Sequence, residues 1–198
     1  MAASSEGTVD RSTLVRGGVA GIVAYLLGYV LTYAWKAPAV ADQLRGINAI
    51  ADALGGQTIP TWKAVGWLFY NAHFVSTRIP ALGGGDRMVN FIQQSNDGSL
   101  ALLYVLVPVL LVLAGAAVAR YGDVDRVGSA AAAGAAVVVG YLPLAVVGAL
   151  VVGHTLGGDV RIAPDVVTAV ALAGLVYPAF FGAVGGGLWY WLASVLES

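Results

Sequence analysis

The stretch Pro60–Phe74, which reads PTWKAVGWLFYNAHF, decides how the rest of the chain is interpreted. It holds two of the five tryptophans, a lysine and a histidine, and it contains no acidic residue. Its apolar centre is about a dozen residues long, whereas a helix needs about 20 to cross a bilayer. Because tryptophan and tyrosine favour the headgroup layer, we predict a helix over 61–75 that lies near the membrane interface, across the outer end of a helical bundle.

The composition around this stretch indicates a membrane protein. Hydrophobic residues make up 59% of the chain and charged residues only 11%, whereas a soluble domain carries roughly 25% charged residues. The net charge of −1 provides no basic field, so nucleic acid is not expected as a partner. The chain has no cysteine, which excludes disulfides, thiolate catalysis and iron–sulfur ligation.

Four apolar runs are long enough to cross a bilayer as helices. A cleaved signal peptide is the alternative for the first run, since Arg11 and Arg16 lie at its start, but the run exceeds the usual length of such a segment. Trp35 and Lys36 at its end are typical of an interface. The expected spanning helices cover residues 14–35, 99–119, 129–153 and 166–190.

The connection over residues 37–98 predicts two helices outside the membrane. Apolar residues at spacings of three and four predict an amphipathic helix over 40–54, and the second helix is the 61–75 segment. In the alternative, residues 59–82 cross as a fifth span, at the cost of placing charges in lipid. The expected fold is therefore all-α: one polytopic membrane domain with four transmembrane helices, a flexible tail over 1–13, and an extracellular amphipathic helical cap between the first two spans.

Basic residues in the short segments predict the orientation. Arg11 and Arg16 precede the first run, and Arg120 and Arg126 flank the loop between the second and third. The next loop has only Arg161. We therefore expect both termini in the cytoplasm, the cap outside, and a multi-pass protein of the cell membrane.

Small residues and prolines recur along the apolar runs. Gly17 and Gly21 in the first run, and Gly182 and Gly186 in the last, let helices approach closely within or between chains. The candidate kink positions are Pro108, Pro143 and Pro178. Each lies near a tyrosine that we expect to point inward, because a hydroxyl in lipid would lack a partner; these are Tyr104, Tyr141 and Tyr177. Kinks can frame a transporter site, but proline is common in membrane helices generally.

The sequence contains no pattern that predicts an active site. His73 and His154 each stand alone, and no cluster has metal-ligand spacing. We therefore expect no catalytic residue, no cofactor and no metal, and we interpret His73 as a hydrogen-bonded residue. Because the centres of the four runs carry no ionisable group, a coupled pump is disfavoured. An uncoupled channel or facilitator for a small solute stays open.

Aromatic and basic side chains of the predicted cap are the candidate contact residues. Its aromatic rings are expected to bury against the bundle or the headgroups, while its basic groups reach water or lipid phosphate. The expected partners are membrane lipid and either a membrane-protein partner or a second copy in a homo-oligomer. The candidate interaction residues are Trp62, Lys63, Trp67, Tyr70, His73 and Arg78.

Three segments carry a resemblance to a known family. The segments IPTWKAVGWLFYNAHFV (59–75), RGGVAGIVAYLLGYVLTY (16–33) and VNFIQQSNDGSLALLY (89–104) resemble a family of uncharacterised haloarchaeal multispanning membrane proteins. Some members are loosely labelled as transporters. The resemblance implies an archaeal cell-membrane location and carries over no catalytic residues. From the residues themselves we expect a non-enzymatic accessory or assembly subunit of a membrane complex, with the channel or facilitator as the alternative.

Overall fold

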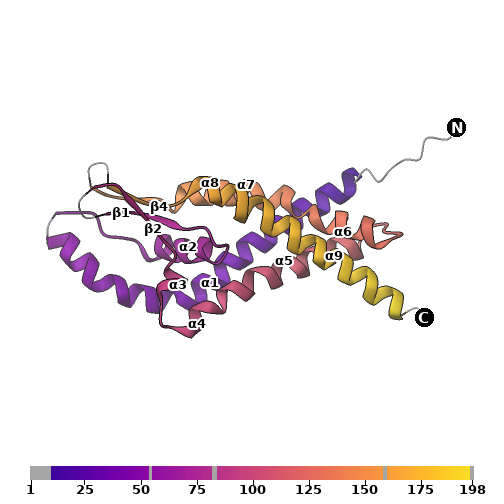
Figure 1. The fold of residues 1–198 in the computed structure, drawn as a ribbon, viewed down its shortest axis with the longest axis horizontal. Helices are drawn as coiled ribbons and strands as arrows, with labels where there is room; N and C mark the ends of the chain where they lie inside the picture. Colours follow the sequence, from indigo (N-terminus) through magenta and orange to yellow (C-terminus); the bar gives the residue numbers. More distant parts are fainter. Residues whose placement is uncertain (1–9, 54, 82–83, 158–159, 197–198) are drawn as a thin grey trace.

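The computed structural model describes residues 10–53, 55–81, 84–157 and 160–196. Most of the expected N-terminal tail (residues 1–9) and Leu54, the last residue of the expected 40–54 helix, lie outside the described residues. The chain is mostly helical, at 74%. Figure 1 shows an elongated helical bundle with a small sheet at one end, while the start of α1 and the end of α9 lie at the other.

Four segments are long and apolar enough to cross a membrane, as the sequence predicted: Arg11–Ala53, Gly98–Arg120, Val127–Val151 and Val166–Leu196. The helices within and between them are α1 (Arg11–Ala53), α2 (Thr61–Asn71), α3 (Phe91–Gln94), α4 (Gly98–Ala101), α5 (Leu103–Arg120), α6 (Val127–Ala135), α7 (Val138–Val151), α8 (Val166–Thr168), the π-helix η1 (Ala169–Val176) and α9 (Tyr177–Leu196).

The first helix differs from the prediction of two separate helices. α1 continues through Pro38 for 43 residues, so the expected 40–54 helix is its C-terminal part. The amphipathic pattern there is real: Val40 and Leu44 face the interior, while the opposite face is exposed. A proline removes one backbone hydrogen bond and bends a helix without always ending it. Figure 1 shows α1 changing direction between the bundle and the end that carries the sheet.

A small antiparallel sheet corrects the all-α prediction. Its four strands have the order β2-β1-β4-β3. β1 pairs with β4 through Thr77↔Pro164, which joins two connections that are far apart in the sequence. We call residues 36–53 of α1, α3 and this sheet the head. The strands are β1 (Thr77–Pro80), β2 (Asp86–Val89), β3 (His154–Gly157) and β4 (Val160–Pro164).

Glycines bring the long helices of the bundle into direct backbone contact. A Cβ atom added to Gly21 would overlap the carbonyl oxygen of Val137, and one added to Gly115 would overlap that of Gly182. A Cβ on Gly186 would overlap the carbonyl of Ala130. We call these contacts the glycine seams. They join α1 to α6 and α7, and they join α9 to both α5 and α6. The small-residue stripes predicted from the sequence therefore pack helices within one chain.

Of the three candidate kink prolines, Pro178 follows the clearest irregularity. The N–H of Tyr177 bonds to the carbonyl of Leu172, five residues back, which is the π-helical pattern. A proline at 178 has no N–H and its ring crowds the carbonyl four residues earlier, so the preceding turn widens. Pro108 and Pro143 lie inside α5 and α7 without ending either helix.

Candidate functional site

α2 lies inside the bundle alongside α7, not across its outer end as predicted. Lys63 Nζ donates to the Gly153 carbonyl (2.6 Å), and Trp67 Nε1 donates to the Val152 carbonyl (2.9 Å). Further along, His73 Nε2 lies 2.7 Å from the Tyr141 hydroxyl. As the residue number rises along α2, the number of its partner falls, from Gly153 just after α7 to Tyr141 within it. α2 therefore enters from the head and runs antiparallel to α7.

Free carbonyls at the end of α7 explain why α2 lies inside the bundle. The last carbonyls of a helix have no partner within it, and two polar side chains of α2 bind the carbonyls of Val152 and Gly153, just after α7. All residues from Ala64 to Asn71 are buried. A Cβ atom on Gly66 would overlap the Val152 side chain, so this glycine permits the close approach. The aromatic content that suggested an interface instead fills the bundle.

The chain turns back at the end of α2, which ends at Asn71 rather than at residue 75. Phe74 has φ of 59°, the one positive value at a non-glycine among the described residues. The Asn71 amide holds the turn: its Nδ2 donates to the Val75 carbonyl (2.8 Å), and its Oδ1 accepts from Phe91 N (2.8 Å). The Phe74 ring stacks on Tyr104 at 4.5 Å between centroids. α2 is therefore a re-entrant helix that enters and leaves from the same end.

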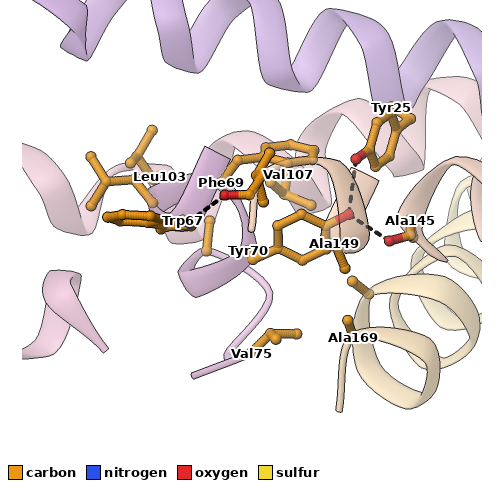
Figure 2. Packing of buried hydrophobic residues seen from close by; sticks show 14 of the residues in the cluster. Tyr25, Trp67, Phe69, Tyr70, Val75, Leu103, Val107, Ala145, Ala149 and Ala169 are labelled. Atoms are coloured by element: carbon orange, nitrogen blue, oxygen red, sulfur yellow. Dashed lines mark hydrogen bonds between the residues drawn. The ribbon is translucent and has the colours of Figure 1, made fainter. Parts of the chain in front are cut away.

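Two tyrosines from different helices meet at a carbonyl of a third. The hydroxyls of Tyr25 on α1 and Tyr70 on α2 are 3.0 Å apart, and Tyr70 donates to the Ala145 carbonyl on α7. Since Tyr70 uses its proton on Ala145, Tyr25 donates to Tyr70. Figure 2 shows this chain of hydrogen bonds among the packed aromatic and aliphatic side chains. It joins α1, α2 and α7 in the interior.

The His73 imidazole makes a second buried connection. Nδ1 lies 2.8 Å from the Phe69 carbonyl, which can only accept, so Nδ1 carries the proton and Nε2 accepts from the Tyr141 hydroxyl. The side chain is fully buried, and this burial lowers the pKa of His73 to about 4, although the bond to Phe69 opposes the shift. The imidazole is therefore neutral at pH 7. We call Tyr25, Tyr70, His73 and Tyr141 the polar centre.

The three tyrosines near the prolines point inward, as predicted. Tyr141 belongs to the polar centre, and the Tyr177 ring lies 5.2 Å from the His73 ring. Tyr104 donates to Asn90 Oδ1 (3.2 Å). The hydroxyls of Tyr141 and Tyr104 therefore have partners in other segments instead of lipid, and the Tyr177 ring packs against the His73 ring.

The other predicted contact residues do not gather on one surface. Trp62 is 40% exposed at the start of α2, whereas Trp67 is buried. Arg78 lies on β1 and pairs with Asp165 (3.0 Å) and Asp86 (3.4 Å), so it binds carboxylates of the head. A backbone hydrogen bond from Thr168 is the main cause that lowers the pKa of Asp165, and the Arg78 guanidinium adds to it.

His154 is a second buried histidine at the start of β3. Its Nε2 has no hydrogen-bond partner among the described residues. Burial lowers the pKa of His154, and the positive charge of Lys63 adds to this effect. No group of three histidine, aspartate or glutamate side chains within the described ranges could hold a metal ion.

A cavity of about 790 Å³ lies between α2 and the head, whose α1 part forms one wall. We call it the chamber. The α1 side chains on its wall recur every three or four residues, so the amphipathic stripe of α1 lines this cavity. The wall is mostly apolar, and its members include Val40, Leu44, Ile47, Trp67, Leu156 and Ile162.

One end of the chamber is polar and holds a buried lysine. Lys36 is only 5% exposed, and its Nζ donates to Ser99 Oγ (2.5 Å). Nζ also lies 4.3 Å from the Trp35 ring centroid and 3.8 Å from Asp97 Oδ2. Sequence reasoning treated Lys36 as an interface residue. Its spacing of four and eight residues from Val40 and Leu44 places it on their face of α1, which is the signal that could have revealed its position.

The fold defines a class of protein: a bundle with four apolar helices of membrane-spanning length, a re-entrant helix and a small sheet at one end. The chain belongs to the family of unknown function DUF7978, which residues 1–193 match. No curated protein and no solved structure matches it.

Proposed function

We propose that this protein is a non-enzymatic, multi-pass membrane protein that serves as an accessory or assembly subunit of a membrane complex. The observation that carries the proposal is the set of glycine seams, which close the bundle backbone to backbone. Helices in such contact leave no room for a solute at the seams, and the hollow of about 790 Å³ between α1 and α5 is lined almost entirely by apolar side chains. The bundle therefore acts as a rigid membrane anchor that holds the head at one surface.

The state of the polar centre supports the same role. The hydroxyls and ring nitrogens of Tyr70 and His73 are bonded inside the bundle. A solute path needs groups that can exchange protein partners for solute, whereas these groups are already paired. They hold α2 against α1 and α7, so we assign them a structural role.

A small uncoupled channel or facilitator is the second candidate, and one observation favours it. Re-entrant segments and interrupted helices are tolerated at membrane depth where they line a water-filled cavity, and they recur in channels and transporters. Here α2 turns back at Phe74, and η1 is π-helical beside it. Opening this site would require breaking the bond between His73 and Tyr141.

We propose the archaeal cell membrane as the location, with both termini in the cytoplasm and the head outside. Four spanning helices would leave both ends of the chain on one side, and the arginines at that end favour the cytoplasm. Reporter tags fused to each end, tested for accessibility in intact cells, examine this arrangement. Termini on opposite sides would contradict it.

Purification in a mild detergent, followed by mass measurement of the intact particle, tests the accessory role. We expect a particle larger than the 20.2 kDa chain, composed of this chain with a membrane-protein partner or a second copy. The same protein in liposomes should not increase the flux of small neutral solutes over protein-free liposomes. A single-chain particle together with measurable flux would favour the facilitator and overturn the accessory proposal.

A further inference from the structure

We propose that the chamber binds a single-chain anionic amphiphile, with its carboxylate at Lys36 and its alkyl chain among the apolar residues of α1, α2 and the sheet. This site goes beyond the accessory role, and it assigns a ligand class to the head.

The size and lining of the chamber fit an alkyl chain. Its volume of about 790 Å³ lies in the range of roughly 300–1,000 Å³ found for small-molecule sites. Along α1 the wall runs from Lys36 to Ala51, a length of about 22 Å at 1.5 Å per residue. Transfer of an alkyl chain from water into such a cavity is favourable because apolar surface is removed from water.

The two charged residues of the wall, Lys36 and Asp97, lie together and mark the polar end of the chamber, which distinguishes an amphiphile from a wholly apolar ligand. Ser95 lies there too, since its Oγ accepts a hydrogen bond from Asp97 N (3.0 Å). Gln57 lies instead beside Leu156, whose carbonyl accepts from Gln57 N (3.3 Å). Ile47, Ile50 and Leu156 belong to the other part of the wall. A ligand with one polar head and one apolar tail matches this division.

The charge of Lys36 favours a ligand whose polar group is an anion. An ammonium group has three donors, and Ser99 Oγ accepts one of them. Asp97 Oδ2 forms a salt bridge with Nζ at 3.8 Å, which is longer than a hydrogen bond, and the Asp97 oxygens accept from the Ser99 backbone and hydroxyl (2.9 and 2.8 Å). A buried ammonium gains most from a short contact with an anion, and a ligand carboxylate at the polar end supplies that contact.

The position of the polar end also suits entry from the membrane surface. Lys36 directly follows the apolar run that ends at Trp35, and its charge lies against the Trp35 ring. Lysine and tryptophan together mark the headgroup level of a membrane helix. An amphiphile that partitions into the headgroup layer can therefore reach Lys36 with its carboxylate and place its alkyl chain in the chamber.

Trp67 on the chamber wall provides a fluorescence reporter. A variant with the other four tryptophans replaced by phenylalanine is placed in phosphatidylcholine nanodiscs and titrated with ω-bromoundecanoic acid, whose bromine quenches a nearby indole. A second variant retains only Trp191, which is 59% exposed on α9 and reports simple partitioning into lipid. We expect saturable quenching of Trp67 and proportional, non-saturable quenching of Trp191.

Comparison with ω-bromoundecanol tests whether the chamber requires a carboxylate on the ligand. We expect Lys36→Gln to weaken binding of the acid about 10-fold, the loss of one charge-assisted hydrogen bond, and to leave binding of the alcohol unchanged. Lys36→Arg keeps the charge and should retain binding of the acid. Lys63→Gln is the matched control, because Lys63 bonds to Gly153 and does not line the chamber.

Filling the chamber tests the assignment of the tail. Ala39 is exposed and lies on the wall, so Ala39→Phe should reduce binding of both probes without disturbing the core. Proportional quenching of Trp67, equal to that of Trp191, would overturn the binding site. If Lys36→Gln and the parent bind the acid with the same affinity, and likewise the alcohol, the assignment of an anionic polar group to the ligand would be overturned.

Discussion

The bundle and the head are held together by different forces. In the bundle, glycines allow the backbones of α5, α6 and α9 to touch, and packing fixes the helices. In the head, short strands, the pair of Arg78 with Asp165 and the Lys36 contacts join the segments around a cavity. The bundle therefore has little tolerance for added volume, whereas the head can exchange contacts and hold a ligand.

The largest expected effect comes from adding one methyl group to a glycine seam. A Cβ atom on Gly182 would meet the Gly134 carbonyl carbon at 3.1 Å and its oxygen at a still shorter distance. Gly182→Ala should therefore destabilise the protein by about 3 kcal/mol, measured by thermal or SDS unfolding in detergent. In Gly187→Ala, on the same helix, the nearest atom is 3.8 Å away, so this control should be neutral or slightly stabilising.

A pH dependence of similar size is expected at the point where α2 meets the bundle. The pKa of His73 is lowered by burial to about 4 from an ordinary value of 6.5, so the unfolded chain binds the proton more readily than the folded one. Stability is therefore complete above about pH 6.5 and falls as the pH decreases toward 4, by up to about 3 kcal/mol. Unfolding of the parent and of His73→Phe across this range isolates the contribution. Equal pH slopes in both proteins would contradict a buried, neutral His73.

A smaller effect is expected from unpairing the same bond. His73→Phe leaves the Tyr141 hydroxyl buried without its partner, which costs about 2 kcal/mol. Adding Tyr141→Phe removes that unpaired group, so the double variant should be more stable than the sum of the two single changes predicts. Additive losses at pH 7 would show that the two side chains do not interact.

The smallest effect is expected in the head. Arg78 is half-exposed, and water and salt screen its pair with Asp165. Arg78→Gln should lower global stability by no more than about 1 kcal/mol, and less at high salt. Faster amide exchange should be confined to β1 and β4. A loss as large as that of Gly182→Ala would show that the head, and not the bundle, controls the stability of the fold.

The four long apolar helices could be predicted because length and hydrophobicity alone define them. The continuity of α1 could not, since Pro38 favours a break as readily as a bend. The sheet could not be predicted because its strands have only four or five residues, three of the four contain proline or glycine, and β1 pairs with β4 across the chain from Thr77 to Pro164. Such pairings leave no periodic signal in either segment.

The depth of α2 could not be predicted because its polar tips bind groups that are distant in the sequence. The Trp67 and Lys63 acceptors lie 85 and 90 residues away, and His73 meets Tyr141 at a separation of 68 residues. Considered alone, a segment with these side chains is typical of an interface. The centres of the four apolar runs carry no acidic or basic residue, but α2 brings His73 into the same interior from outside them.

The most direct test of this account is whether Phe69 lies beside the middle of α1. A Cβ atom on Gly28 would be 2.9 Å from Phe69 Cε2. Phe69 is replaced by p-azidophenylalanine, the protein is illuminated in nanodiscs, and the attachment site is mapped by mass spectrometry of the peptides. We predict attachment within α1 around Gly28. Attachment to lipid, or to residues of α1 beyond Lys36, would contradict the re-entrant α2 and return the helix to the outer end of the bundle.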